Sequence, residues 1–135
     1  MNAFSASPAG AGIRVLLCDD DLANRELFRA MLIPAGMTVD AFSDAESAVA
    51  ALERDLYDVV LMDVMMQGMS GMDAARAIRR LQGPMGRVPI IGVTARSSEE
   101  AMDECLASGM NHVLMKPIRR TELLDALSEL VPRTG

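Results

Sequence analysis

The segment Tyr57-Asp58-Val59-Val60-Leu61-Met62-Asp63 (YDVVLMD, residues 57–63) decides how the rest of the chain is interpreted. Val59 to Met62 contain no polar residue, which is typical of a strand that is covered on both faces, as in a parallel sheet flanked by helices. Asp63 then stands where the strand leaves the sheet, and ligands of open α/β sheets bind at the carboxyl ends of the strands. Taken alone, Asp63 is better explained as a polar residue that marks a strand end, so its meaning depends on the other strand ends.

Apolar runs and stretches of helical periodicity alternate along the chain. We expect strands at about residues 13–18, 37–42, 57–63, 89–94 and 112–115, and helices at about residues 22–35, 43–54, 72–81, 97–108 and 123–131. Ser43 with Glu46, and Ser97 with Glu100, fit capping boxes at two helix starts. This alternation predicts one α/β domain, a doubly wound (βα)5 fold with a parallel five-stranded sheet and helices on both faces.

The composition bounds the class of protein. The 135 residues suit a single domain, which we place at residues 13–133 after a flexible tail of uncharged residues at 1–12. A net charge of −6 argues against binding to nucleic acid or to an anionic membrane, and no apolar stretch is long enough to cross a bilayer. Two cysteines without a CxxC motif and the lack of a visible signal peptide predict a reduced, cytoplasmic protein.

Four of the predicted strands end in residues that complement one another. Asp19 and Asp20 follow the first strand, Asp63 ends the third, Thr94 ends the fourth and Lys116 follows the fifth. Because the carboxyl ends of parallel strands share one edge, these side chains are expected to converge. Clustered carboxylates repel one another, and a hard cation such as Mg²⁺ removes that cost. A carboxylate nucleophile, a cation, a lysine and a hydroxyl together suit phosphoryl transfer to an aspartate.

At this point the chain resembles the receiver domain of two-component response regulators, of the CheY-like superfamily. The resemblance rests on four motifs in order: VLLCDDD at 15–21, VVLMDVMMQGMSGMDAARAIR at 59–79, PIIGVTA at 89–95 and GMNHVLMKPI at 109–118. It implies a flavodoxin-like sheet with strand order 2-1-3-4-5. It also implies that a histidine kinase or a histidine phosphotransfer protein donates the phosphoryl group.

The resemblance assigns a role to each residue of the cluster. Asp63 is expected to be the phosphoacceptor. Asp20 and Asp63, with the backbone carbonyl of Met65, are expected to bind Mg²⁺ directly, and Asp19 through water. Thr94 is expected to hydrogen-bond a phosphoryl oxygen and Lys116 to pair with it. Phosphorylation should then alter the face formed by the fourth helix, the fifth strand and the fifth helix, which a downstream protein or a second copy of the chain would bind.

The sequence departs from the family pattern at two places. Gln67 stands where the family usually has proline, so its loop should be more mobile. Val113 stands where the family often has tyrosine or phenylalanine, which puts an aromatic switch coupled to Thr94 in doubt. Met65 and Arg96 occupy places that tune the phosphoryl lifetime in the family. The only histidine, His112, is interpreted as a surface residue near a strand start rather than as a phosphohistidine.

Alternatives remain open at this stage. The chain is either a free-standing regulator, which its initiator methionine favours, or a receiver domain from a hybrid histidine kinase. A haloacid-dehalogenase-like phosphatase also uses an aspartate and Mg²⁺, but such enzymes carry a second aspartate two residues on, where this chain has Met65. A degenerate receiver that serves only as an interaction module is disfavoured by the intact cluster. A dinucleotide-binding domain is disfavoured because no GxGxxG follows the first strand.

Overall fold

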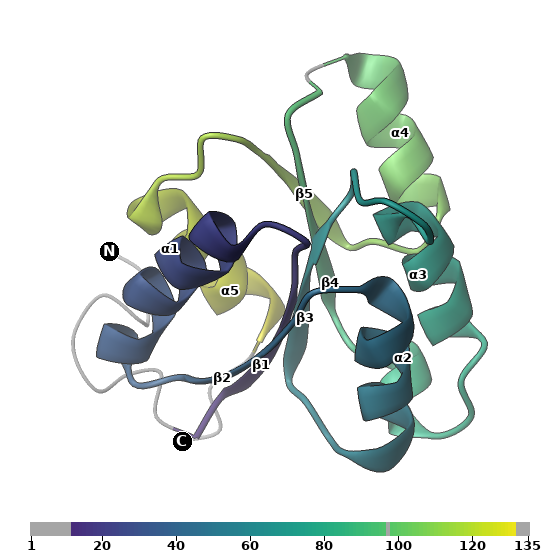
Figure 1. Ribbon diagram of the computed structural model, residues 1–135, viewed down its shortest axis with the longest axis horizontal. Helices are drawn as coiled ribbons and strands as arrows, with labels where there is room; N and C mark the ends of the chain where they lie inside the picture. The colour runs from purple at the N-terminus through teal and green to yellow at the C-terminus, as the bar shows by residue number, and fades with distance from the viewer. Residues whose placement is uncertain (1–11, 97, 132–135) are drawn as a thin grey trace.

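The computed structural model describes residues 12–96 and 98–131, in which five strands alternate with five α-helices (Figure 1). The strands are β1 Arg14–Cys18, β2 Thr38–Phe42, β3 Val59–Asp63, β4 Ile90–Thr94 and β5 His112–Met115. The helices are α1 Leu22–Leu32, α2 Ala45–Arg54, α3 Gly71–Arg79, α4 Glu99–Ala107 and α5 Arg120–Leu130, with short 3-10 helices η1 Ile33–Ala35 and η2 Pro84–Arg87. The tail predicted for residues 1–12 lies outside the described residues apart from Gly12, so the domain bounds 13–133 stay a prediction.

All neighbouring strands of the sheet pair in parallel, in the order β2-β1-β3-β4-β5. The doubly wound α/β fold and its strand order are therefore confirmed. All five residues of β3 are buried, as expected of a central strand covered on both faces. The edge strand β2 is only partly buried, which explains its weaker apolar pattern in the sequence.

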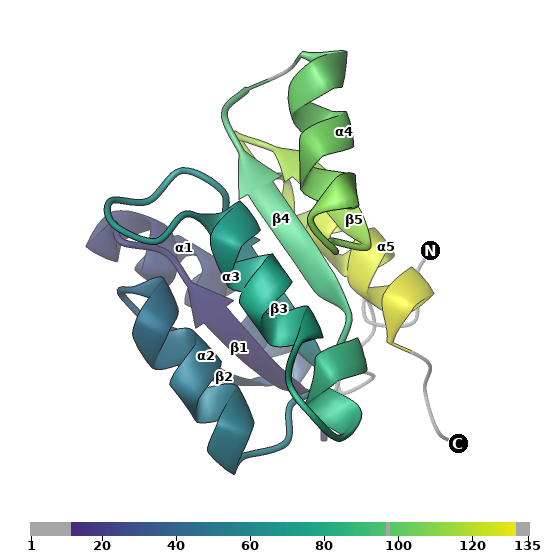
Figure 2. The same ribbon diagram turned by 90° about the vertical axis from the view of Figure 1, so that its right-hand side faces the viewer.

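The two faces of the sheet carry separate apolar cores, because side chains alternate along each strand. Val15 and Leu17 of β1 pack with residues of α1 and α5, whereas Leu16 and Cys18 pack with residues of α2, α3 and α4. Figure 1 shows these two helical layers on either side of the sheet, and Figure 2 shows α2, α3 and α4 lying over one face. The two cores cover both faces of the sheet, and the parallel pairing places the carboxyl ends of the strands at one edge.

The N-cap of α2 corrects one sequence prediction. Asp44, not Ser43, caps this helix, because its carboxylate accepts a hydrogen bond of 2.7 Å from the backbone N–H of Ser47. Serine and aspartate are both good N-caps, and Asp44 is the cap because the helix begins at Ala45. At α4 the hydroxyl of Ser98 accepts from the N–H of Ala101 at 3.1 Å, while Ser97, the predicted cap, lies outside the described residues.

The first helix ends earlier than the predicted range 22–35. Its α-helical part stops at Leu32, and the chain continues as the 3-10 helix η1, which contains Pro34. Proline lacks an N–H and clashes with the carbonyl of the preceding turn, so it ends the α-helix here. Gly36 then adopts φ 95°, a left-handed conformation that glycine tolerates and that turns the chain into β2.

None of the helices in the described ranges is long and apolar enough to span a bilayer.

Candidate functional site

Four of the five strands deliver their polar residues to one edge of the sheet. Asp63 and Thr94 are the last residues of β3 and β4, while Asp19 and Lys116 directly follow β1 and β5. Asp19, Asp63 and Thr94 are 1%, 4% and 1% exposed. Such burial is unusual for carboxylates, which are seldom buried unless they are paired or bind a metal. A plain polar strand end does not account for it.

Three carboxylates form a compact cluster at this edge. One carboxylate oxygen from each of Asp19, Asp20 and Asp63 lies within 4.8 Å of the other two. Asp19 and Asp63 are buried, whereas Asp20 is exposed. One oxygen of Asp19, Oδ1, accepts a hydrogen bond of 2.9 Å from the N–H of Asp21, but the other, Oδ2, is buried without a hydrogen-bond partner. The cluster therefore contains a buried oxygen that still lacks a hydrogen-bond partner.

Lys116 supplies the positive charge at this cluster. Its Nζ lies 3.4 Å from Oδ1 of Asp63 and 3.9 Å from Oδ2 of Asp19. Three carboxylates and one ammonium leave an excess of negative charge at the site. The backbone N–H of Met65 donates a further hydrogen bond to Oδ1 of Asp63 at 3.3 Å.

The electrostatics of Asp63 follow from this environment. Burial, and next the negative charge of Asp19, raise the pKa of the Asp63 carboxyl to about 6, while Lys116 opposes the shift. A carboxylate that resists ionisation in the metal-free protein is one that a bound cation would stabilise. The residues present fit a hard divalent cation such as Mg²⁺, which takes oxygen ligands and commonly uses one or two carboxylates.

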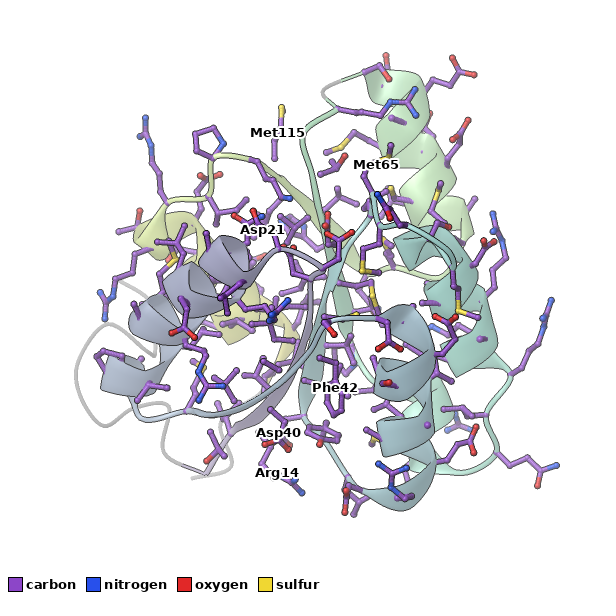
Figure 3. All side chains as sticks on the ribbon, viewed as in Figure 1. Arg14, Asp21, Asp40, Phe42, Met65 and Met115 are labelled. Atoms are coloured by element: carbon purple, nitrogen blue, oxygen red, sulfur yellow. The ribbon has the colours of Figure 1, made fainter. Side chains whose placement is uncertain are left out.

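Thr94 and Met65 reach the same edge in different ways. The Thr94 hydroxyl accepts a hydrogen bond of 3.1 Å from the N–H of Arg96, which holds it beside the strand end. The backbone N–H of Lys116 donates to the carbonyl of Thr94 at 2.8 Å, so β4 and β5 stay paired up to the site. The side chain of Met65 is 56% exposed and is labelled in Figure 3. The hydrogen bond between Met65 and Asp63 comes from the backbone N–H of Met65.

Several residues that shape the site were not assigned a role from the sequence. The Arg25 guanidinium donates to the carbonyl of Asp19 at 2.9 Å, and the N–H of Gln67 donates to Oδ2 of Asp20 at 3.3 Å. A Cβ on Gly71 would collide with the backbone of Asp63 and Val64, so only glycine lets α3 begin this close to the site. Backbone bonds leave no mark on a sequence, but the glycine at the start of a helix could have been noticed.

The remaining candidates lie elsewhere. His112 is the first residue of β5 and so lies at the opposite edge of the sheet from Asp63, which agrees with its interpretation as a residue near a strand start. Val113 is buried in the core beneath α3 and α4. Cys18 and Cys105 are both free and buried, and burial raises the pKa of the Cys18 thiol to about 12. A thiol of this kind is inert, which argues against cysteine chemistry at the site.

Comparison with known proteins defines the class. A family model described as the response regulator receiver domain matches residues 15–128. The chain therefore belongs to this family of phosphoacceptor signalling domains, which work in two-component and phosphorelay systems. The match over most of the chain favours this class over the haloacid-dehalogenase-like phosphatase.

Individual relatives give the same result. The chain is 33% identical over 123 residues to the sensory/regulatory protein RpfC of Xanthomonas campestris pv. campestris, covering 90% of this chain and 17% of that protein. It is 38% identical over 116 residues to the sensor protein GacS of Pseudomonas syringae pv. syringae, covering 84% of this chain and 13% of that protein. The chain thus spans less than a fifth of the length of these curated relatives.

Solved structures agree with the fold. The receiver domain of sensor histidine kinase PA1611 from Pseudomonas aeruginosa PAO1 superposes with a TM-score of 0.84 at 36% identity, covering 91% of this chain and all of that chain. That structure has a magnesium ion coordinated in the active site cleft. Chemotaxis protein CheY4 of Vibrio cholerae also gives a TM-score of 0.84, at 30% identity, covering 90% of this chain and all of that one.

Proposed function

We propose that Asp63 accepts a phosphoryl group from the phosphohistidine of a histidine kinase or of a histidine phosphotransfer protein. The observation that carries this proposal is the position of Asp63, which is buried at a strand end within 3.4 Å of Lys116 and beside two further carboxylates. The related PA1611 receiver domain binds magnesium in its active site cleft. We accordingly assign Mg²⁺ as the cofactor, held by Asp20, Asp63 and the carbonyl of Met65, with Asp19 assisting.

The transfer forms one bond and breaks another. A carboxylate oxygen of Asp63 bonds to phosphorus while the bond from phosphorus to the imidazole nitrogen of the donor breaks, and the nitrogen keeps the electron pair. Bound Mg²⁺ supplies charge neutralisation on the transferred group. Lys116 pairs with a phosphoryl oxygen, and the Thr94 hydroxyl donates a hydrogen bond to another. The chain acts in this way only on its own phosphorylation and dephosphorylation, so we class it as a regulator rather than an enzyme.

The test of the acceptor is intact mass after incubation with acetyl phosphate, with and without Mg²⁺. Wild type should gain one phosphoryl group only when Mg²⁺ is present, and Asp63→Asn should gain none. Asp103→Asn is the matched control, because Asp103 is an exposed carboxylate on α4. Equal uptake by wild type and Asp63→Asn would show that Asp63 is not the acceptor.

The output of the domain is a change in binding. Phosphorylation places charge and strong acceptors beside Thr94 and Lys116, so the proposed switch shifts an existing equilibrium of α4 and β5. A downstream protein or a second copy of the chain then binds the face formed by α4, β5 and α5. Light scattering on the phosphorylated and unphosphorylated protein alone distinguishes these two partners, since only self-association raises the mass.

Because the donors are ATP-dependent kinases and their relays, we assign the cytoplasm as the compartment.

A further inference from the structure

The loop between β3 and α3 reaches across the site to one of the proposed metal ligands. The backbone N–H of Gln67 donates to Oδ2 of Asp20 at 3.3 Å, and the two residues lie 47 positions apart in the chain. Within the described residues, the carboxylate of Asp20 accepts this hydrogen bond and no other. The orientation of Asp20 therefore depends on where this loop lies.

The other two carboxylates of the cluster are held locally. Asp19 accepts from the N–H of Asp21, and Asp63 accepts from the N–H of Met65, in both cases two residues further along the chain. Asp19 and Asp63 are also buried, which restricts their side chains. Asp20 has neither constraint, because it is exposed beside an open groove lined by Val64, Met66 and Gln67. An exposed carboxylate samples several rotamers unless a bond fixes it, and fixing it beforehand lowers the entropy cost of binding.

The donor in this bond is a feature of this particular sequence. Gln67 stands four residues after Asp63, where receiver domains usually have proline. Proline has no backbone N–H and could not make the bond to Asp20. The residue at this position of the chain thus supplies a hydrogen-bond donor directed at the site.

We propose that the backbone N–H of Gln67 is a positioning group for Asp20, so that Mg²⁺ affinity and the order of the β3–α3 loop are coupled. The proposal rests on the assignment of Asp20 as a metal ligand in the proposed function. Groups that hydrogen-bond to metal ligands orient them and commonly affect metal affinity. Coupling of this kind is reciprocal, so Mg²⁺ binding also orders the loop. Gly68, next in the chain, has φ 78°, a left-handed conformation that glycine tolerates.

The test compares Gln67→Pro with Gln67→Ala. Proline removes the N–H, whereas alanine removes only the exposed side chain and keeps the N–H. Calorimetric titration with Mg²⁺ alone, without a phosphodonor, should show about tenfold weaker binding for Gln67→Pro. Gln67→Ala should bind Mg²⁺ as wild type does. In wild type and in Gln67→Ala, Mg²⁺ should slow amide hydrogen exchange in the loop, and in Gln67→Pro it should not.

Proline also stiffens the chain, so a second variant isolates the bond. Replacing Gln67 by its 2-hydroxy acid analogue, through semisynthesis, exchanges the N–H for an ester oxygen and leaves the backbone angles free. This variant should lose Mg²⁺ affinity to the same extent as Gln67→Pro. Wild-type affinity in both variants would overturn the positioning role.

The outcomes separate this role from the proposed function. If wild type gains a phosphoryl group while both N–H-deficient variants bind Mg²⁺ normally, the acceptor role of Asp63 stands and the role of Gln67 falls. If these variants lose Mg²⁺ affinity while wild type never becomes phosphorylated, the role of Gln67 stands and that of Asp63 falls. If wild type binds no Mg²⁺ at all, the positioning role falls with the metal site.

Discussion

At the scale of single residues, Asp63 illustrates how a site is built at a cost in stability. The carboxyl is 4% exposed, and its pKa is raised from 3.8 to about 6. Ionisation is therefore disfavoured in the folded protein, which loses stability relative to the unfolded chain as the pH rises from 3.8 through 6. The loss is retained at neutral pH unless a cation binds. A salt-bridged carboxyl with a lowered pKa does the opposite, because its contribution to stability is lost as the pH falls.

Asp63→Asn is accordingly expected to stabilise the metal-free protein at neutral pH, by about 1–3 kcal/mol. The gain should shrink as the pH falls below 6, because the wild-type carboxyl is then protonated. Saturating Mg²⁺ should reduce or reverse the difference, since only wild type keeps the full ligand set. Urea unfolding of both proteins, with a chelator and with Mg²⁺, measures these differences. A variant less stable than wild type at neutral pH without metal would contradict the argument.

At the scale of secondary-structure elements, the N-cap of α2 provides a prediction that compares two adjacent residues. The carboxylate of Asp44 accepts from both the N–H and the hydroxyl of Ser47, at 2.7 and 3.0 Å, and these bonds lower the pKa of Asp44. Asp44→Ala should cost about 1 kcal/mol of unfolding free energy. Ser43→Ala, which removes the residue that the sequence pattern favoured, should change stability by less than half of this amount. Thermal unfolding at neutral pH distinguishes the two variants.

Arg14 of β1, Asp40 of β2 and Tyr57, which lies in the segment before β3, contact one another away from Asp63 (Arg14 and Asp40 are labelled in Figure 3). The Tyr57 hydroxyl donates to Asp40 at 2.6 Å, and the Arg14 guanidinium lies 4.6 Å from the centre of the Tyr57 ring. Burial and the neighbouring Asp40 raise the pKa of Tyr57 from 10.0 to about 12. The contact joins β1 and β2 to the segment two residues before β3.

Titration of Tyr57 tests this contact directly, because it is the only tyrosine in the chain. Near-ultraviolet absorbance should give a midpoint near 12 in the folded protein and a lower midpoint in Asp40→Asn. Because the folded state disfavours tyrosinate, this residue should also cost the protein stability as the pH rises above 10.0. A midpoint near 10.0 in wild type would show that the hydroxyl is free in solution.

The elements also show which features could be predicted from the sequence. Strands such as β3 are continuous apolar runs between polar residues, and parallel pairing follows from their alternation with helices, so the fold and the convergence of Asp63 and Lys116 could be inferred. Helix ends are harder to predict from the sequence, because Ser43 and Asp44 are equally good caps and only the residue at which α2 begins distinguishes them. The bond from Gln67 to Asp20 could not be predicted, because it uses a backbone N–H and joins residues distant in the chain.

At the scale of the whole molecule, the rim of the site is more apolar than its floor. Asp19 and Asp63 are buried, whereas the four large apolar side chains that we call the rim are exposed. Leu22 and Leu27 on α1, Met65 after β3 and Met115 at the end of β5 are 61%, 50%, 56% and 40% exposed. Leu27 also lines an apolar pocket with Phe28, Pro117 and Ile118, next to Lys116. Because Asp63 is nearly buried, a protein that carries a phosphohistidine can reach it only by contacting this rim.

Small and protein phosphodonors should therefore respond differently to changes in the rim. Acetyl phosphate is small enough to enter without contacting Leu27, whereas a protein donor is expected to bury it, and a carboxylate buried there without a partner is costly. Leu27→Asp should slow phosphorylation by the protein donor about tenfold and leave the rate with acetyl phosphate unchanged. Leu106→Asp on α4 is the matched control, since Leu106 is 48% exposed and lies away from the site. Equal slowing of both donors by Leu27→Asp would show that the substitution damages the site itself, and no slowing of either would place the donor on another surface.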